Sequence, residues 1–275
     1  MYMYRVLFIS LFLSSISIAD TLLVPEEFKT IQLAMDASTT GDVIDLASGT
    51  WHNQIVWGLS GVTLKGRDGG ETIIDGSKQE WSSVVCYNKP AIIENITFQN
   101  GVGSNIFGYI RGGAVYVEFS QVTIRNCNFV NNRVIVDEFN GGAAGGAICN
   151  YFGSVIIESC NFESNESLGT SEFGGGGAIY STVGNLSITD SKFENNVSLF
   201  YGGGIYAEYS KNYSVTNCIF RNNATALDGG GMYNLESAPA LTNCTFEDNT
   251  ASQYGGATCN IKSNPTLDGC TFINN

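Results

Sequence analysis

Residues 112–132, GGAVYVEFSQVTIRNCNFVNN, contain the pattern that decides the fold. A glycine pair opens the stretch, the β-branched run Val122-Thr123-Ile124 lies in its middle, and Cys127-Asn128-Phe129 precedes Asn132. Runs this short and this rich in β-branched residues favour strands over helices. The inward positions of two short strands that meet at a bend would be Val122, Ile124, Cys127 and Phe129.

The same pattern recurs along the chain. Its phenylalanine-centred segment occurs seven times, with spacings of 26 to 33 residues, and asparagine follows three residues after Phe in six copies. The phenylalanines are Phe98, Phe129, Phe162, Phe193, Phe220, Phe246 and Phe272. Glycine pairs precede short apolar runs at 112–113, 145–146, 176–177, 203–204 and 230–231. A fixed period in this range is the signature of a solenoid.

Stacked coils explain why like residues recur. Each Phe would lie on the Phe of the next coil, beside columns of Ile and Cys. Asparagines at the bends and after Phe are expected to adopt a positive φ and to hydrogen-bond along the stack. The glycine pairs are expected at sharp turns or close approaches. The sequence therefore predicts an all-β fold, a single-stranded right-handed parallel β-helix of roughly nine or ten coils, at ~25–30 residues per coil.

The two ends of the chain differ from the repeats. Residues 1–19 have a short basic start, an apolar run and small residues before Asp20, which predicts a signal peptide. Residues 25–37 predict an amphipathic helix that caps the first coil. Residues 20–275 are then one β-helix domain. It stops inside the motif at Asn275 with no polar capping segment, so we expect it to be incomplete at the C-terminus.

Charge restricts the classes of partner. The chain has 26 acidic and 13 basic residues, a formal net charge of −13. A surface of this sign repels phosphate backbones, so nucleic acid is not an expected partner. Beyond the signal peptide no segment is apolar over the length of a membrane span. Calcium is compatible with the charge, but no clear cluster of ligands supports it, and we predict no cofactor.

Two motifs resemble known β-helix families. Gly-Gly-Ala-Ile and Phe-x-x-Asn resemble the repeats of polymorphic outer membrane proteins, whose passenger regions are β-helices. The stretch from Val24 to Trp51, with Lys29-Thr30-Ile31-Gln32 and Gly41-Asp42-Val43-Ile44, is similar to the segment that opens pectin-lyase-like β-helices. The resemblance covers nearly the whole mature chain. It implies the fold, which carries lyases, hydrolases, esterases and adhesins alike.

The repeats contain no evident carboxylate pair. Polysaccharide hydrolases need two carboxylates that flank the scissile bond. Glu163 and Glu194 stack on successive coils, but their position points outward, where solvated charges are the norm. Asp75 is explained as a turn residue before glycine.

Other catalytic chemistries are equally weakly supported. A calcium-dependent lyase needs a basic residue beside the metal, and Arg111, Arg125 and Arg133 lie in a suitable region. Arg125 and Glu158, however, would be neighbours on successive coils, which predicts an ion pair. His52 is the only histidine, which excludes a His-based metal site or catalytic triad within this chain.

Five of the eight cysteines fall in one predicted column: Cys127, Cys160, Cys218, Cys244 and Cys270. A strand spacing of about 4.8 Å allows a disulfide between neighbours, and an exported protein meets an oxidising compartment. Three consecutive cysteines cannot all pair, and Ser191 occupies the same column, which favours a ladder of buried thiols. Both alternatives stay open at this point.

Seven Asn-x-Ser/Thr sequons are candidate N-glycosylation sites in a eukaryotic host. They begin at Asn95, Asn165, Asn185, Asn196, Asn212, Asn223 and Asn243. An Asn- and Thr-rich turn repeat also generates such sequons by chance.

Function in solenoids usually lies in loops, and the longer coils should loop out at residues 134–140 and 168–173. The candidate ligand contacts are Phe107, Tyr109, Phe139 and Phe173. We predict a secreted or cell-surface scaffold, adhesin-like or carbohydrate-binding, whose partner is an extracellular carbohydrate or a host-surface molecule. The alternatives are a polysaccharide lyase or epimerase whose active site lies outside this chain or is not recognisable in it, and a purely structural surface-layer element.

Overall fold

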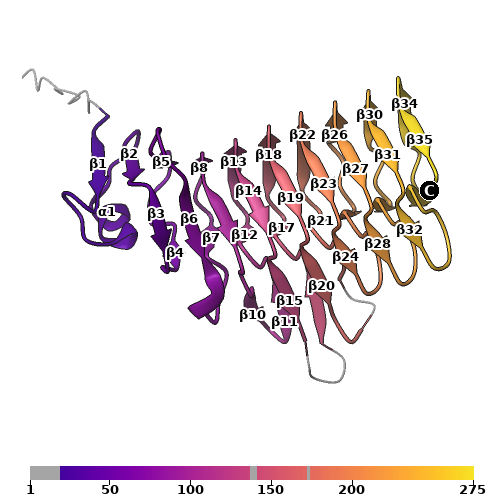
Figure 1. The fold of residues 1–275 in the computed structure, drawn as a ribbon, viewed down its shortest axis with the longest axis horizontal. Coiled ribbons are helices and arrows are strands. Elements are labelled where there is room, and N and C mark those ends of the chain that lie inside the picture. The colour runs from indigo at the N-terminus through magenta and orange to yellow at the C-terminus, as the bar shows by residue number, and fades with distance from the viewer. Residues whose placement is uncertain (1–18, 137–140, 172–173) are drawn as a thin grey trace, which may run out of the picture.

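The structure is a computed structural model that describes residues 19–136, 141–171 and 174–275. This part of the chain winds into a right-handed parallel β-helix, whose coils follow one another along the long axis of Figure 1. Among the described strands, the β10–β11 pair alone is antiparallel. The predicted fold class is confirmed. The predicted signal peptide lies, except for Ala19, outside the described residues.

Three long sheets form the sides of the helix. Sheet A contains β1 Thr21–Val24, β2 Val43–Leu46, β5 Val62–Gly66, β8 Ala91–Glu94, β13 Gln121–Arg125, β18 Ser154–Glu158, β22 Asn185–Thr189, β26 Tyr213–Thr216, β30 Ala240–Thr242 and β34 Thr266–Asp268. Sheet B contains β3 Gly49–Trp51, β6 Thr72–Asp75, β9 Thr97–Gln99, β14 Asn128–Val130, β19 Asn161–Glu163, β23 Lys192–Glu194, β27 Ile219–Arg221, β31 Thr245–Glu247 and β35 Thr271–Ile273. Sheet C contains β4 Ile55–Val56, β7 Val84–Tyr87, β12 Val115–Glu118, β17 Ile148–Tyr151, β21 Ile179–Thr182, β25 Ile205–Glu208, β29 Met232–Leu235 and β33 Thr258–Ile261.

Two smaller sheets complete the coils. Sheet E contains β15 Arg133–Ile135, β20 Glu166–Leu168, β24 Val197–Ser198, β28 Ala224–Thr225 and β32 Thr250–Ala251. Sheet D contains β10 Ser104–Ile106, β11 Tyr109–Arg111 and β16 Gly142–Ala144. Each regular coil therefore runs from sheet C to A to B and then to E. Sheets A, B and C have ten, nine and eight strands, so the described chain makes about eight full turns rather than the nine or ten expected from the repeat length.

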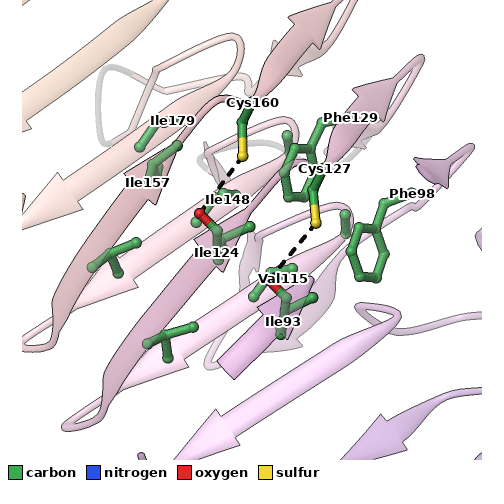
Figure 2. Close-up of a cluster of buried hydrophobic side chains, with 14 of the residues drawn as sticks. Ile93, Phe98, Val115, Ile124, Cys127, Phe129, Ile148, Ile157, Cys160 and Ile179 are labelled. Carbon is green, nitrogen blue, oxygen red and sulfur yellow. Dashed lines mark hydrogen bonds between the residues drawn. The ribbon is translucent and has the colours of Figure 1, made fainter. Parts of the chain in front are cut away.

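The interior consists of columns of like side chains. Figure 2 shows Phe98 beside Phe129, with Ile93, Ile124 and Ile157 in a parallel column. Six successive phenylalanine pairs stack with ring centroids 4.7–5.3 Å apart and planes within 12°. The parallel register places these residues directly above one another, so the predicted Phe and Ile columns are confirmed.

The asparagines three residues after Phe form a buried ladder. The Asn165 Nδ2 donates to the backbone oxygen of Phe129 at 2.9 Å and to the Oδ1 of Asn196 at 2.9 Å. The predicted hydrogen bonds along the stack are thus confirmed. The predicted positive φ at these asparagines is wrong, because it belongs to the preceding residue, such as Asn131 or Asn195, and the ladder residue itself must point inward. The bend asparagines Asn95, Asn126, Asn217 and Asn243 do have φ between 51° and 57°.

A short helix, α1 Ile31–Ala37, packs against the first coil through Ile31, Ala34 and Met35. It begins six residues later than predicted, because the Thr30 hydroxyl caps it by accepting from the Leu33 N–H at 3.2 Å. The one other described helical element is the 3-10 turn η1 Gly76–Lys78.

Candidate functional site

The outer face of sheet C carries a cluster of tyrosines. Side chains alternate along a strand, so the second residue of each sheet C strand points away from the main core. The parallel register then stacks these residues in one outer row: Tyr116, Cys149, Tyr180, Tyr206, Tyr233 and Cys259. Sheet D and the turns beside it cover part of this row, which explains why the tyrosine rings are largely buried.

A groove of about 340 Å³ opens over this row, and we call it the tyrosine groove. It is lined by Tyr109, Arg111, Ala144, Tyr151, Phe152, Gly174, Tyr180, Thr182, Val183, Tyr206, Glu208 and Tyr209. Volumes of this order suit a small ligand or a short segment of a polymer. The lining joins a few charged groups to many aromatic rings, the usual composition of a ligand site.

Arg111 lies at one end of the tyrosine groove. Its guanidinium is 4.4 Å from the centroid of the Tyr151 ring and 5.3 Å from that of Tyr109. No carboxylate of the described residues lies within ion-pair distance of Arg111, whereas the other four described arginines each pair with at least one glutamate. Burial opposes the charge on Arg111, but its pKa is still raised, because the Cys149 and Tyr116 side chains favour the cation. A cationic donor held over an aromatic ring is therefore available to a ligand.

Glu208 lies on the groove wall two rungs beyond Tyr151. Its carboxylate accepts hydrogen bonds from the hydroxyls of Tyr180 and Tyr206, the latter at 3.0 Å. Burial and the neighbouring Glu208 charge raise the pKa values of Tyr180 and Tyr206 well above the usual tyrosine range. Both phenols are thus neutral hydrogen-bond donors at physiological pH and cannot act as bases.

Glu118 and Glu208 do not have the spacing of a glycosidase pair. Glu118 accepts from the Tyr116 hydroxyl at 2.8 Å. It lies three rungs from Glu208, which at about 4.8 Å per rung is ~14 Å. Catalytic carboxylate pairs are about 5–9.5 Å apart. These two groups cannot flank one glycosidic bond.

Exposed aromatic side chains border the groove at the bend between sheets C and A. Phe119 and Phe152 stack with centroids 5.4 Å apart, and Tyr151 meets Phe152 edge-on at 4.7 Å. We call Phe119, Phe152, Val183 and Tyr209 the bend column. Sequence reasoning missed both the tyrosine row and this column, although the bend column follows the left-handed glycine of each coil by a constant seven residues.

The predicted ligand contacts are only partly brought together. Tyr109 lines the groove, whereas Phe107 is 98% exposed at the tip of the β10–β11 hairpin and does not line it. Phe139 and Phe173 lie outside the described residues.

The arginines and acids considered for catalysis have structural partners. Arg125 bonds Glu158 at 2.6 Å and Glu94 at 3.1 Å, so the predicted ion pair is confirmed. Arg133 bonds Glu166 at 2.6 Å.

Asp75 is the turn residue expected from the sequence. Its carboxylate caps η1 by accepting from the Ser77 N–H at 2.9 Å. Burial opposes the charge, but hydrogen bonds from Ser77 and Gln99 outweigh it and lower the pKa of Asp75 to about 2.

Glu163 and Glu194 are neighbours in register on the outer face of sheet B. Glu194 bonds Arg221 at 3.3 Å. Within the described parts of the chain, no group of three His, Cys, Asp or Glu side chains is placed to hold a metal ion. No described helix is long and apolar enough to cross a membrane.

The cysteine column is a ladder of thiols in the structure. Cys127 and Cys160 occupy successive coils, and their sulfurs donate to the backbone oxygens of Ile93 at 3.9 Å and Ile124 at 3.7 Å (Figure 2). Burial raises the pKa of the Cys127 thiol well above its usual range. The hydrogen bond between Cys127 and Cys160 instead lowers the pKa of the Cys160 thiol. Burial of both side chains shields the thiols from exchange.

We expect the thiol ladder to persist in the purified protein. Unfolding without reductant in iodoacetamide should add eight carbamidomethyl groups, one for each cysteine, as intact mass spectrometry would show. The control is the same protein reduced before alkylation. A mass lower than the control by two adducts would instead reveal a disulfide between neighbouring coils.

The seven sequon asparagines form two groups, one buried in the ladder and one outside it. Asn165, Asn196 and Asn223 belong to the buried ladder, where each Nδ2 already donates two hydrogen bonds and no space remains for a glycan. The other four lie on the outside or at bends, and their glycosylation stays a prediction: Asn95, Asn185, Asn212 and Asn243.

Comparison with known proteins agrees with this architecture. The model of the family described as right handed beta helix region matches residues 49–226 and 176–275. No curated protein sequence matches the chain. The resemblance to repeats of polymorphic outer membrane proteins stays a prediction.

Solved structures share the fold at low identity. Polygalacturonase from Erwinia carotovora ssp. carotovora superimposes with a TM-score of 0.51 at 10% identity, over 92% of this chain and 92% of that chain. Pectin methylesterase from Aspergillus niger gives 0.41 at 12% identity, over 94% and 87%. A surface protein and adhesin from Streptococcus pneumoniae gives 0.26 at 12% identity, over 88% and 95%. The resemblance to pectin-lyase-like β-helices is confirmed for the fold, and the chain belongs to the right-handed β-helix family.

Proposed function

We propose that the protein is a secreted or cell-surface scaffold that binds carbohydrate in the tyrosine groove. In this proposal residues 1–19 direct export, and residues 20–275 form the β-helix that presents the groove outside the cell. Adhesion to a glycan-bearing surface is the role that such a scaffold would serve.

One observation carries the proposal. The tyrosine groove holds an arginine without a carboxylate partner, stacked on Tyr151, and a carboxylate, Glu208, that is oriented by two phenols. Aromatic rings bind the apolar faces of sugars, and planar charged groups at fixed positions bind their hydroxyls. Arg111 and Glu208 lie at different places along the groove, so a short oligosaccharide can contact both.

The three-rung separation of Glu118 and Glu208 does not fit a hydrolytic pair, which favours binding over hydrolysis. The direct test is a glycan array probed with the full secreted chain, followed by calorimetry with the glycans that bind. Release of unsaturated uronate from pectate or alginate with calcium present would instead establish the lyase alternative. Stable folding without either result would support a purely structural role.

Replacing Arg111 with alanine should weaken binding of the strongest array glycan about tenfold to a hundredfold, because a charge-assisted hydrogen bond is lost. The matched control is Arg221→Ala on sheet B, which removes an arginine paired with Glu194 and Glu247 far from the groove. Isothermal titration calorimetry measures both affinities. Equal affinities for the two variants would contradict the assignment of the groove as the binding site.

A further inference from the structure

From Gly112 onward each coil has four positions of positive φ: a glycine before sheet C and one residue at each of three bends. At the bend between sheets A and B, and at the bend after sheet B, this residue is Asn, Asp, Ser or Gly in every described coil from Asn95 onward. At the bend between sheets C and A, four successive coils carry the large residues of the bend column: Phe119, Phe152, Val183 and Tyr209, with φ between 50° and 55°. The next two coils carry Glu236 and Lys262 at this bend, with φ of 48° and 49°.

The bend column departs from the preference for Asn, Asp, Ser and Gly that the chain shows at the other two bends, and Glu236 and Lys262 depart from it too. Asparagine and glycine adopt a positive φ with little strain, whereas aromatic and β-branched residues are outliers there. Burial does not compensate for the strain, since the four side chains are 50%, 41%, 46% and 46% exposed. A strained backbone conformation that brings no additional burial of the side chain is typical of a functional position.

The spacing along the column leaves a gap of one ring. Phe119 and Phe152 lie on successive rungs and stack with centroids 5.4 Å apart. Val183 occupies the next rung and Tyr209 the one after it, so Phe152 and Tyr209 are separated by about 9.6 Å, or two rungs. A single ring placed above Val183 would lie about 4.8 Å from each aromatic neighbour. Val183 thus stands where the column lacks an aromatic ring.

The gap belongs to the tyrosine groove, because Phe152, Val183 and Tyr209 all line it. We propose that Phe152 and Tyr209 clamp one sugar ring of the bound glycan above Val183. This inference rests on the proposed function and adds the identity of the ring. Thr182 precedes Val183 at the gap and Glu208 precedes Tyr209 at its edge, and both offer oxygens to the hydroxyls at the rim of the sugar.

The clamp selects the stereochemistry of the sugar. An aromatic face attracts the weakly positive C–H groups of a sugar ring, and the clamp presents such a face on each side. A β-gluco-configured pyranose has equatorial hydroxyls and axial C–H groups on both faces. A galacto-configured ring has an axial hydroxyl on one face, which would press an oxygen against an aromatic ring. The ligand class is therefore a β-linked glycan of gluco configuration.

Two substitutions at Val183 test the clamp with cellohexaose as the probe. Val183→Phe supplies the missing ring and closes the gap, so calorimetry should show a loss of affinity of about tenfold or more. Val183→Asn leaves the gap open and relieves the backbone, so affinity should stay within about twofold while the Tm rises by ~2–4 °C. The wild-type chain should bind cellohexaose about tenfold more tightly than β-1,4-linked galactohexaose.

A third variant separates clamping from packing. Tyr209→Asn should raise the Tm and lower the affinity for cellohexaose, because the tyrosine is kept at the cost of backbone strain. A lower Tm for Tyr209→Asn would show that the ring serves packing, and would overturn the clamp.

The outcomes distinguish the clamp from the wider proposal. Unchanged affinity in Val183→Phe, or equal binding of both hexaoses, would overturn the clamp while Arg111→Ala still tests the groove. Array binding confined to glycans without gluco-configured rings would likewise overturn the clamp and leave the proposed function in place. An array with no binding at all would overturn both.

Discussion

Replacing Asn196 with alanine should lower the free energy of unfolding by about 3–5 kcal/mol. The Asn196 Nδ2 donates to the Phe162 oxygen at 3.0 Å and to the Asn223 Oδ1 at 2.9 Å. Its Oδ1 accepts from the backbone N–H and the Nδ2 of Asn165, at 3.0 and 2.9 Å. All of these groups are buried, so alanine leaves the Asn165 N–H without its acceptor and breaks the ladder in the middle.

The measurement is urea unfolding followed by circular dichroism, with the midpoint compared between variants. The matched control is Asn185→Ala, which removes an exposed asparagine whose side chain bonds only another exposed amide, that of Asn212. We expect the control to change stability by less than about 0.5 kcal/mol. Equal shifts for the two variants would show that the ladder contributes little to the fold.

The solenoid could be predicted from the sequence because its columns are visible as a repeat. Identical coils place Phe on Phe and Asn on Asn, so the spacing of Phe129 and Phe162 already specifies which residues stack. The Arg125–Glu158 ion pair follows from the same alignment. Local backbone conformation did not follow: the positive φ lies one residue before each ladder asparagine, because only an inward-pointing residue can reach the next coil.

The tyrosine groove could not be predicted because its parts do not share the repeat. Arg111 comes from the β10–β11 hairpin, which a single coil contains, and it reaches Tyr151 of the next coil. Glu208 comes from two coils further along. Only the register of sheets C and D brings these residues to one place. The search for exposed aromatic residues suggested Phe107 as a ligand contact. This residue lies at the tip of the β10–β11 hairpin, which points away from the groove.

The bend column is a different case, since the sequence contains its signal. Counting seven residues from the left-handed glycine before each sheet C strand gives Phe119, Phe152, Val183 and Tyr209, followed by Glu236 and Lys262, where the other bends have Asn, Asp, Ser or Gly. The spacing from this glycine to Phe is 17 residues in five coils and 18 in the other one, so alignment on either residue brings the column into line. The positive φ of its members was not evident because their residue types do not favour it.

Replacing Gly177 with alanine should have the largest effect of any single substitution considered, a loss of more than about 4 kcal/mol. A Cβ at this position would lie 2.2 Å from the backbone oxygen of Gly203 and 2.6 Å from the backbone N and O of Val197. These are main-chain atoms of neighbouring turns, so they can move only if the coils separate and sheet hydrogen bonds break.

Gly58→Ala is the matched control, because its Cβ meets nothing within 4 Å and its backbone lies outside the left-handed region. There alanine should be neutral or should stabilise the fold by up to about 1 kcal/mol, since it restricts the unfolded chain. Thermal unfolding of the two variants measures the difference, and a Gly177→Ala protein as stable as Gly58→Ala would mean that the coils are not packed as closely as the fold requires.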